Sequence, residues 1–291
     1  MQDKLIIYEF SDPLCPWCWG SEPILRKLES RFGVQIRYIM VGMIEDVRKE
    51  VPDITEEGYM EYNDGIASKW EEQAIKHKMP VNPYDFSLFD NKSNSTWPLC
   101  ISYKAAEFQD LEKANRLLRR FREQIFLEGK KAVRNSSILS TVVEVGLDLD
   151  QYIEDVTGGK AEKAFLEDIE LAKKHKITSY PSYLFRYKGE EVVVRGFTYY
   201  QTMKALIKGL TDGEIEDKGI EISKMMDVIN RYYGIAIYEL AEIFEIEYPR
   251  LHEILNDMSQ NNEIIIEEHG ENIYVRKNKK IEGCSLEGCE L

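Results

Sequence analysis

Residues 4–41 read KLIIYEFSDPLCPWCWGSEPILRKLESRFGVQIRYIMV. The apolar run over residues 4–10 predicts a buried strand. Apolar side chains at helical spacing predict a helix from about Pro16 to Phe32, which Gly33 ends. The β-rich stretch 34–41 predicts a second strand. A strand, a helix and a strand within about forty residues predict a βαβ unit with two parallel strands.

The middle of the chain has mainly helical periodicity. This block covers residues 55–175, after which residues 182–187 and 191–195 are again β-rich and are joined by a short turn that predicts a hairpin. A further helix is expected near 199–208. The helices expected inside the block are Thr55–Lys78, Pro98–Glu107, Leu111–Glu128, Ser136–Val145, Leu149–Val156 and Ala161–Lys174.

A stretch rich in glycine and acidic residues, Thr211–Gly219, is typical of a linker. Three helices and then two short strands are expected after it, an order typical of a small winged-helix domain. The expected helices are Ile220–Tyr232, Ile237–Phe244 and Pro249–Gln260, and the expected strands are Glu263–Glu267 and Ile273–Val275.

The composition favours a folded, soluble protein. The chain has 291 residues, of which 43% are hydrophobic and 31% are charged. No run of 18 apolar residues is present, and the first residues lack the pattern of a secretory signal, so we expect a cytoplasmic protein without a membrane span. The net charge of −14 argues against nucleic-acid partners, whose binding requires lysine and arginine.

The segment after the linker is strongly acidic. Residues 214–271 hold fifteen Asp or Glu against four Lys or Arg. Such a surface repels phosphate, so the winged-helix order does not indicate DNA binding here. Packing on the first domain, self-association and docking of a basic protein partner all remain open.

The chemistry is carried by Cys15-Pro16-Trp17-Cys18. At the start of a helix, the unpaired N–H groups and the helix dipole favour a thiolate on Cys15, and the thiolate is the form that attacks a disulfide. The spacing places Cys18 one turn further on, within reach of a disulfide bond. Pro16 occupies the first helical position, where its missing N–H carries no penalty.

Two other interpretations of this cysteine pair are a zinc site and inert packing. Zinc requires about four ligands, and no second CxxC or spaced histidine pair follows in the sequence. Redox chemistry is therefore the favoured interpretation, and we expect neither a metal nor a cofactor.

Two segments resemble a known family. Residues 10–19, FSDPLCPWCW, are similar to the active-site entry of DsbA-like oxidoreductases, and the CPWC form is similar to their cytosolic FrnE branch. Residues 177–185, ITSYPSYLF, resemble the family's proline-containing element. The resemblance extends over about 4–210. It implies a thioredoxin fold with a large helical insertion.

The resemblance also implies roles for single residues. Pro181 is expected to follow a cis peptide bond and to face the dithiol, and the backbone of Tyr180 is expected to pair with an incoming peptide. Glu9 is expected to be a buried acid beneath the dithiol that accepts a proton from Cys18. The alternatives are an ordinary trans proline and a glutamate on an edge strand in water.

The two residues between the cysteines are expected to contact substrates. Trp17 would offer an apolar surface at the rim of the site, next to Pro16. Secreted oxidases of the family often carry histidine where this chain has Trp17, which argues against a strongly oxidising potential. Trp19 and Ile24 are expected in the core.

Three further cysteines remain. Cys284 and Cys289, at the end of the chain, are spaced to form a disulfide, as in FrnE-type tails. We hypothesise that they exchange with Cys15 and Cys18 as auxiliary redox residues. Solvent-exposed thiols without a role and a weak metal clasp are the alternatives. Cys100 is expected to be a small buried apolar residue without a catalytic role.

The sequence thus predicts an α/β chain in three parts: a thioredoxin-like domain over 1–212 with its helical insertion at about 55–175, an acidic winged-helix-like α+β domain over 213–278, and a cysteine-containing tail over 279–291. The predicted function is thiol–disulfide exchange or isomerisation on protein or small disulfides, with Cys15 as nucleophile and Cys18 as resolving thiol. An adaptor without essential redox chemistry and a glutathione-dependent isomerase relative are the alternative functions.

Overall fold

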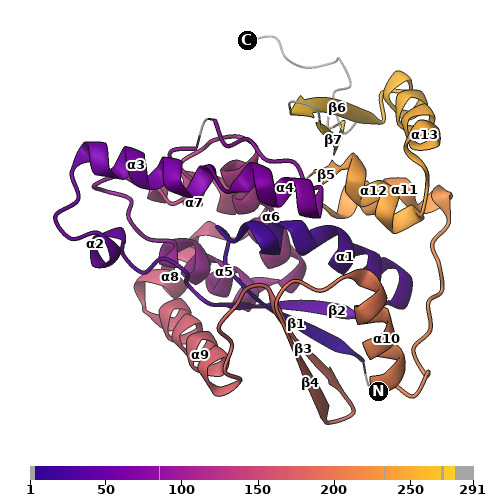
Figure 1. The fold of residues 1–291 in the computed structure, drawn as a ribbon, viewed down its shortest axis with the longest axis horizontal. Coiled ribbons are helices and arrows are strands. Elements are labelled where there is room, and N and C mark those ends of the chain that lie inside the picture. The colour runs from indigo at the N-terminus through magenta and orange to yellow at the C-terminus, as the bar shows by residue number, and fades with distance from the viewer. Residues whose placement is uncertain (1–3, 85, 233, 270–271, 279–291) are drawn as a thin grey trace.

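A four-stranded sheet forms the centre of the first part of the chain (Figure 1). The computed structural model describes residues 4–84, 86–232, 234–269 and 272–278. The strand order is β2-β1-β3-β4, with β1 parallel to β2 and antiparallel to β3. These strands are β1 (Ile6–Ser11), β2 (Gln35–Met40), β3 (Ser182–Tyr187) and β4 (Glu190–Arg195). The predicted βαβ unit, the hairpin and the thioredoxin-like α/β fold are therefore confirmed.

Helix α1 (Pro16–Phe32) connects the two parallel strands, with the bounds that the sequence predicts. Pro16 begins it, and Gly33 ends it with a left-handed backbone at φ 65°, from which its N–H donates to the carbonyl of Glu29 at 3.1 Å. Both ends of the helix are therefore specified locally, by a proline that fits the first turn and by a glycine that fits the left-handed turn.

Gly33→Ala should lower the free energy of unfolding by about 1 kcal/mol, because a left-handed backbone is strained for a residue with a Cβ. No atom lies within 4 Å of the position that the added Cβ would take, so the whole effect is conformational. Urea denaturation measures it. Gly65→Ala is the matched control: its Cβ also meets no atom, but its backbone is helical, so that variant should be as stable as the wild type or slightly more stable.

Most of the helical insertion (Figure 1) belongs to the core on the face of the sheet that carries Ile7 and Tyr38, whereas Ala172 near the end of α9 packs against Phe10 and Leu184 on the other face. One correction concerns the helix predicted over 55–78, which is two helices, α3 and α4, broken at Ser68 and Lys69. The break allows Trp70 to turn inward against Phe86 and Phe126, at ring-centroid distances of 4.6 and 4.7 Å. The insertion comprises α2 (Val47–Glu50), α3 (Glu56–Ala67), α4 (Trp70–His77), α5 (Trp97–Gln109), α6 (Leu111–Phe126), α7 (Asn135–Glu144), α8 (Leu149–Thr157) and α9 (Lys160–Lys174).

The end of the chain forms a small α+β unit, called here the C-terminal unit (residues 220–278), which follows α10 (Tyr200–Leu210). The helix predicted over 220–232 is shorter than expected, because its start is a 3₁₀ turn and α11 begins at Met225. Its three-stranded sheet has the order β5-β7-β6. The elements are η1 (Ile222–Lys224), α11 (Met225–Arg231), β5 (Ile235–Ala236), α12 (Ile237–Phe244), α13 (Tyr248–Gln260), β6 (Ile264–His269) and β7 (Asn272–Lys277).

Acidic residues of the C-terminal unit form ion pairs with basic residues of α1. Lys27 lies 3.1 Å from Glu245 and 3.5 Å from Glu242, and Arg31 lies 2.8 Å from Glu245. The unit therefore packs on the first part of the chain, which is one of the three alternatives that the sequence leaves open. The described residues include no helix with the length and apolar character needed to cross a membrane.

A candidate dithiol active site

Cys15 and Cys18 form a disulfide at the N-terminus of α1, with their Cα atoms 5.2 Å apart. Cys15 is the N-cap residue of this helix, and its Sγ accepts a hydrogen bond from the Cys18 N–H at 3.2 Å. The same N–H would stabilise a thiolate on Cys15 after reduction. Cys18 is completely buried, so attack from outside must occur at Cys15.

The loop before Cys15 is fixed by a buried carboxylate that the sequence analysis does not single out. Asp12 accepts hydrogen bonds from the backbone N–H groups of Leu14 and Met43, both at 2.8 Å, and from the Thr96 hydroxyl at 3.0 Å. The Cys100 thiol also donates to Asp12, at 3.5 Å, and Cys100 is fully buried. Asp12 thus ties the Cys15 loop to the helical insertion, and Cys100 is the buried residue that the sequence predicts.

A groove of about 650 Å³ lies in front of the dithiol. Cys15 is only 2% exposed, but it lines this groove. The peptide bond between Tyr180 and Pro181 is cis. The residues that line the groove come from the active-site loop, the loop after β2, the insertion and the segment before β3. They include Leu14, Cys15, Pro16, Trp17, Met43, Ile44, Tyr62, Ile66, Trp70, Thr178, Ser179 and Tyr180.

Trp17 lies at the rim, between two aromatic rings that come from distant segments. Its ring is edge-on to His77, at 5.8 Å between centroids, and 5.3 Å from that of Phe197. Burial lowers the pKa of His77 to about 4, so the imidazole is neutral at physiological pH. Trp19 is in the core, where its indole N–H donates to the Pro80 carbonyl at 2.8 Å.

Glu9 is completely buried on the central strand β1, so the alternative of an edge-strand glutamate in water is wrong. Its Oε1 is 2.6 Å from the Ser21 hydroxyl, and its Oε2 is 3.8 Å from the Arg122 guanidinium. Burial raises the pKa of Glu9 to about 7, although Arg122 and Ser21 act in the opposite direction. This carboxyl therefore gains and loses a proton near neutral pH.

Ser21 connects Glu9 with the dithiol helix. Its Oγ lies 2.6 Å from Glu9 and 2.8 Å from the Cys18 carbonyl oxygen, but a hydroxyl has only one proton to donate. When Glu9 is protonated, it can donate to Ser21, and Ser21 can then donate to Cys18. The local hydrogen bonds thus accommodate protonated Glu9 fully, in agreement with its raised pKa.

Arg122 belongs to a set of buried charged residues that the sequence analysis does not identify. Its guanidinium donates to Glu22 on α1 and, at 2.5 Å, to the Ser11 hydroxyl. Burial would raise the pKa of Glu22, but Arg26, Arg122 and Arg119 lower it to about 2. Glu22 is therefore a carboxylate shared by three cations.

The predicted site residues are brought together in part. Cys15 and Cys18 lie at the start of α1, Glu9 lies in the central strand β1, and residues 180–181 directly precede β3. Pro16 and Trp17 line the groove with Cys15 and Tyr180. Ile24 is half-buried against the core. Cys284 and Cys289 lie outside the described residues, so the structure does not place them.

The family model described as Thioredoxin matches residues 8–205. The protein named ClpXP adapter protein SpxH from Halalkalibacterium halodurans is 27% identical over 250 residues, which cover 84% of this chain and 79% of that protein. The SpxH of Bacillus subtilis is 25% identical over 260 residues, or 88% of this chain and 82% of that protein.

A solved structure, the cytosolic disulfide reductase DsbM from Pseudomonas aeruginosa, has a TM-score of 0.55 at 19% sequence identity and covers 71% of this chain and 98% of its own. That likeness concerns the fold. The family match covers more than half of the chain, and the sheet order and the CxxC at the start of α1 agree with it. The chain therefore belongs to the thioredoxin family.

Proposed function

We propose that this chain is a thiol–disulfide oxidoreductase that acts on protein or small disulfides held in the groove beside Cys15. The observation that carries the proposal is the position of Cys15, which caps α1 and is the cysteine of the pair that lines the groove. Pro16, Trp17, Tyr180 and Pro181 are the proposed contacts for substrate. The placement in the FrnE branch rests on the CPWC motif and on the cysteine pair at positions 284 and 289.

The proposed reaction is a two-step exchange. In the reduced protein, the Cys15 thiolate attacks one sulfur of a substrate disulfide, that S–S bond breaks, and the other substrate sulfur leaves as a thiolate. Cys18 then gives its proton to Glu9 and attacks the sulfur of Cys15. The second substrate thiolate leaves, and the Cys15–Cys18 disulfide forms. Two electrons pass to the substrate, and the reverse sequence oxidises a dithiol.

The reduction potential of the Cys15–Cys18 pair tests this proposal. The full-length chain would be equilibrated in glutathione buffers of graded potential, quenched with acid and alkylated, and the disulfide fraction would be read by mass spectrometry. We expect reversible formation of one disulfide and reduction of insulin at a catalytic rate. A pair that neither oxidises nor reduces in any glutathione buffer would overturn the proposal.

Glu9→Gln should remove a pH dependence of stability. The carboxyl titrates near pH 7 in the folded chain and at about 4.5 when unfolded, so between these values the folded state binds the additional proton. The contribution of Glu9 to the free energy of unfolding should therefore fall as pH rises through this window, by about 3 kcal/mol at most, so the wild type should lose that much stability relative to Glu9→Gln, in which the other titrating groups are unchanged. The variant should lack this fall and should resolve the mixed disulfide about tenfold more slowly or worse.

Urea denaturation at pH 5 and pH 8 measures the first effect, and quenched-flow trapping of the mixed disulfide measures the second. Glu61→Gln, at an exposed position of α3, is the matched control and should behave as the wild type. Equal pH dependence in Glu9→Gln and the wild type would show that Glu9 is not the titrating group.

We also propose that the tail cysteines Cys284 and Cys289 exchange with the dithiol as an auxiliary pair. The spacing of these two cysteines allows a disulfide between them, and thiolates exchange with a disulfide, which supports the idea. We propose in addition that the protein is cytoplasmic and that it isomerises disulfides. Its proposed partners are compounds or proteins that carry thiols or disulfides. Neither nucleic acid nor a membrane is among the proposed partners.

A second candidate function is that of a ClpXP adapter. The observation that favours it is the extent of the match to the SpxH proteins, whose alignments cover 84% and 88% of this chain. Alignments of that length are longer than residues 1–205, so they extend beyond the last residue that the family model matches. A Cys15→Ser/Cys18→Ser double variant separates the two functions. Retained binding to purified ClpXP without disulfide exchange would identify an adapter that does not depend on the dithiol.

A further inference from the structure

A continuous buried ion-pair network, defined here as Glu9, Arg122, Glu22, Arg119 and Glu239, runs from Glu9, which is linked to the Cys18 backbone through Ser21, into the C-terminal unit. The Arg122 guanidinium lies 3.8 Å from Glu9 and pairs with Glu22 at its other nitrogen. Arg119 lies 3.6 Å from Glu22 and holds Glu239 with both terminal nitrogens, at 2.6 and 3.0 Å. All five side chains are buried.

The C-terminal unit supplies most of the partners of Arg119. Glu239, on α12, is completely buried and also accepts the Ala236 N–H at 2.8 Å. Arg119 donates in addition to the Gly234 carbonyl at 3.2 Å and to the Tyr274 hydroxyl at 2.7 Å. Burial alone would lower the pKa of Arg119, but the carboxylates around it raise it above its ordinary value, so this side chain stays a cation.

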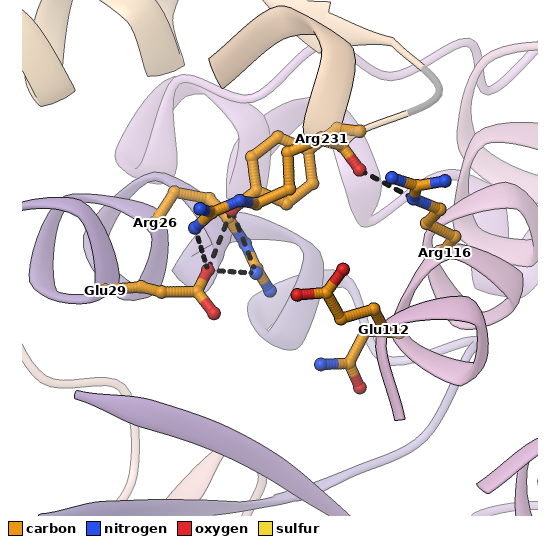
Figure 2. A pocket seen from close by; sticks show the side chains of 7 residues that line it. Arg26, Glu29, Glu112, Arg116 and Arg231 are labelled. Atoms are coloured by element: carbon orange, nitrogen blue, oxygen red, sulfur yellow. Dashed lines mark hydrogen bonds and ion pairs between the residues drawn. The ribbon is translucent and has the colours of Figure 1, made fainter. Parts of the chain in front are cut away.

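A second contact holds α1 itself against the unit, around a cavity of about 40 Å³ between α1, α6 and α11 (Figure 2). Glu29 accepts hydrogen bonds from Arg26 at 2.9 Å and from the Tyr232 hydroxyl at 2.8 Å. Across the cavity, Arg116 donates to the Arg231 carbonyl at 2.9 Å. The helix that carries the dithiol is therefore fixed to the C-terminal unit through Glu29 and Tyr232 as well as through the ion pairs of Lys27 and Arg31 with Glu245.

We propose that Glu239, in the C-terminal unit, is a positioning residue of the dithiol site: by holding Arg119 it determines how strongly Glu22 neutralises the positive charge that Arg122 presents to Glu9. The inference rests on the proposed function of the dithiol. Charge is weakly screened in a buried network, so a change at one end is felt at the other. The C-terminal unit is then part of the redox site as well as a neighbour of it.

The direction of the effect follows from the charges that face Glu9. Helix α6 contributes Arg122, and α1 contributes Glu22 and Arg26. The neighbouring strands contribute the titratable side chains Tyr183 and Tyr38. Without the negative charge of Glu239, Arg119 keeps its pair with Glu123 at 3.2 Å and attracts Glu22 more strongly, which weakens the hold of Glu22 on Arg122 and frees Arg122 to face Glu9. The site becomes more positive, and both a Glu9 carboxylate and a Cys15 thiolate are favoured.

The test is the pH dependence of Cys15 alkylation by iodoacetamide in the reduced full-length chain. We expect the pH midpoint to fall by about half a unit in Glu239→Gln and to rise by a similar amount in Arg119→Gln, which removes the opposite charge. Glu239→Asp, which keeps the charge, should restore the wild-type midpoint. Damage to the fold alone would move both variants in the same direction.

Glu245→Gln is the matched control, because Glu245 also joins α12 to α1, through Lys27 and Arg31, but has no contact with the network. Its midpoint should equal that of the wild type. Unchanged midpoints in Glu239→Gln and Arg119→Gln, shifts of the same sign in both, or an equal shift in Glu245→Gln would overturn the inference. Failure of the proposed function is seen separately, as a wild-type chain that alkylates normally but does not exchange disulfides.

Discussion

Replacing Cys15 by serine should abolish disulfide exchange, with turnover of insulin reduced roughly a thousandfold or more, because a hydroxyl does not attack a disulfide and neither of the other two cysteines that the structure describes can take its place. Cys18 is completely buried behind Cys15, and the buried Cys100 donates its S–H to Asp12 in the loop before the dithiol. The expected result is loss of exchange in a protein that remains as stable as the reduced wild type.

Replacing Cys18 by serine should give a different result. Cys15 can still attack and form a mixed disulfide, but the resolving thiol is absent, so the complex accumulates instead of turning over. Non-reducing gel electrophoresis with peptide mapping identifies what is bound to Cys15. A bond from Cys15 to Cys284 or Cys289 in the purified chain would support the auxiliary role of the tail, and its absence in every preparation would contradict that role.

Cys100→Ala is the matched control for both cysteine variants, and its exchange rate should equal that of the wild type. A Cys15→Ser protein that exchanges disulfides as fast as the wild type would contradict the assignment of Cys15 as the nucleophile. Equal trapping by Cys15→Ser and Cys18→Ser would mean that the two thiols do not have distinct roles.

The sequence predicts the local features of the site well, because each is encoded by neighbouring residues. Pro16 and Gly33 specify the two ends of α1, and the CxxC spacing specifies one helical turn between the two sulfur atoms. The cis bond before Pro181 agrees with the family resemblance, since propensity alone favours trans. Structural features that are determined by residues close together in the sequence could therefore be predicted.

The buried ion-pair network could not be predicted, because its members are distant in sequence and polar. In α6, Arg119 and Arg122 belong to a strongly charged stretch that by itself is typical of a solvated helix face. They are buried because α1 and the C-terminal unit cover α6, which no local pattern indicates. Likewise, the acidic surplus of residues 214–271 suggested a solvated surface, whereas Glu239 is buried on Arg119.

Arg122→Met should lower the free energy of unfolding by about 3 kcal/mol or more at pH 7, because it removes one partner from a buried ion pair. Glu22 would lose one of its three cations, and the Ser11 hydroxyl would lose its guanidinium donor. Since Arg122 lowers the pKa of Glu9, its removal should also move the titration of Glu9 to higher pH. The upper end of the pH window in which stability falls should therefore move upward with it, whereas the lower end, which the unfolded chain sets, should stay in place.

Urea denaturation across pH measures both effects, and a double-mutant cycle with Glu22→Gln isolates the pair. In the double variant neither an unpaired carboxylate nor an unpaired guanidinium is left at this contact, so the loss should be smaller than the sum of the single losses. Arg48→Met, which breaks an exposed pair with Asp46, is the control and should change stability by less than about 1 kcal/mol. A similar small loss in Arg122→Met would mean that the buried network neither stabilises the fold nor fixes the charge beneath the dithiol.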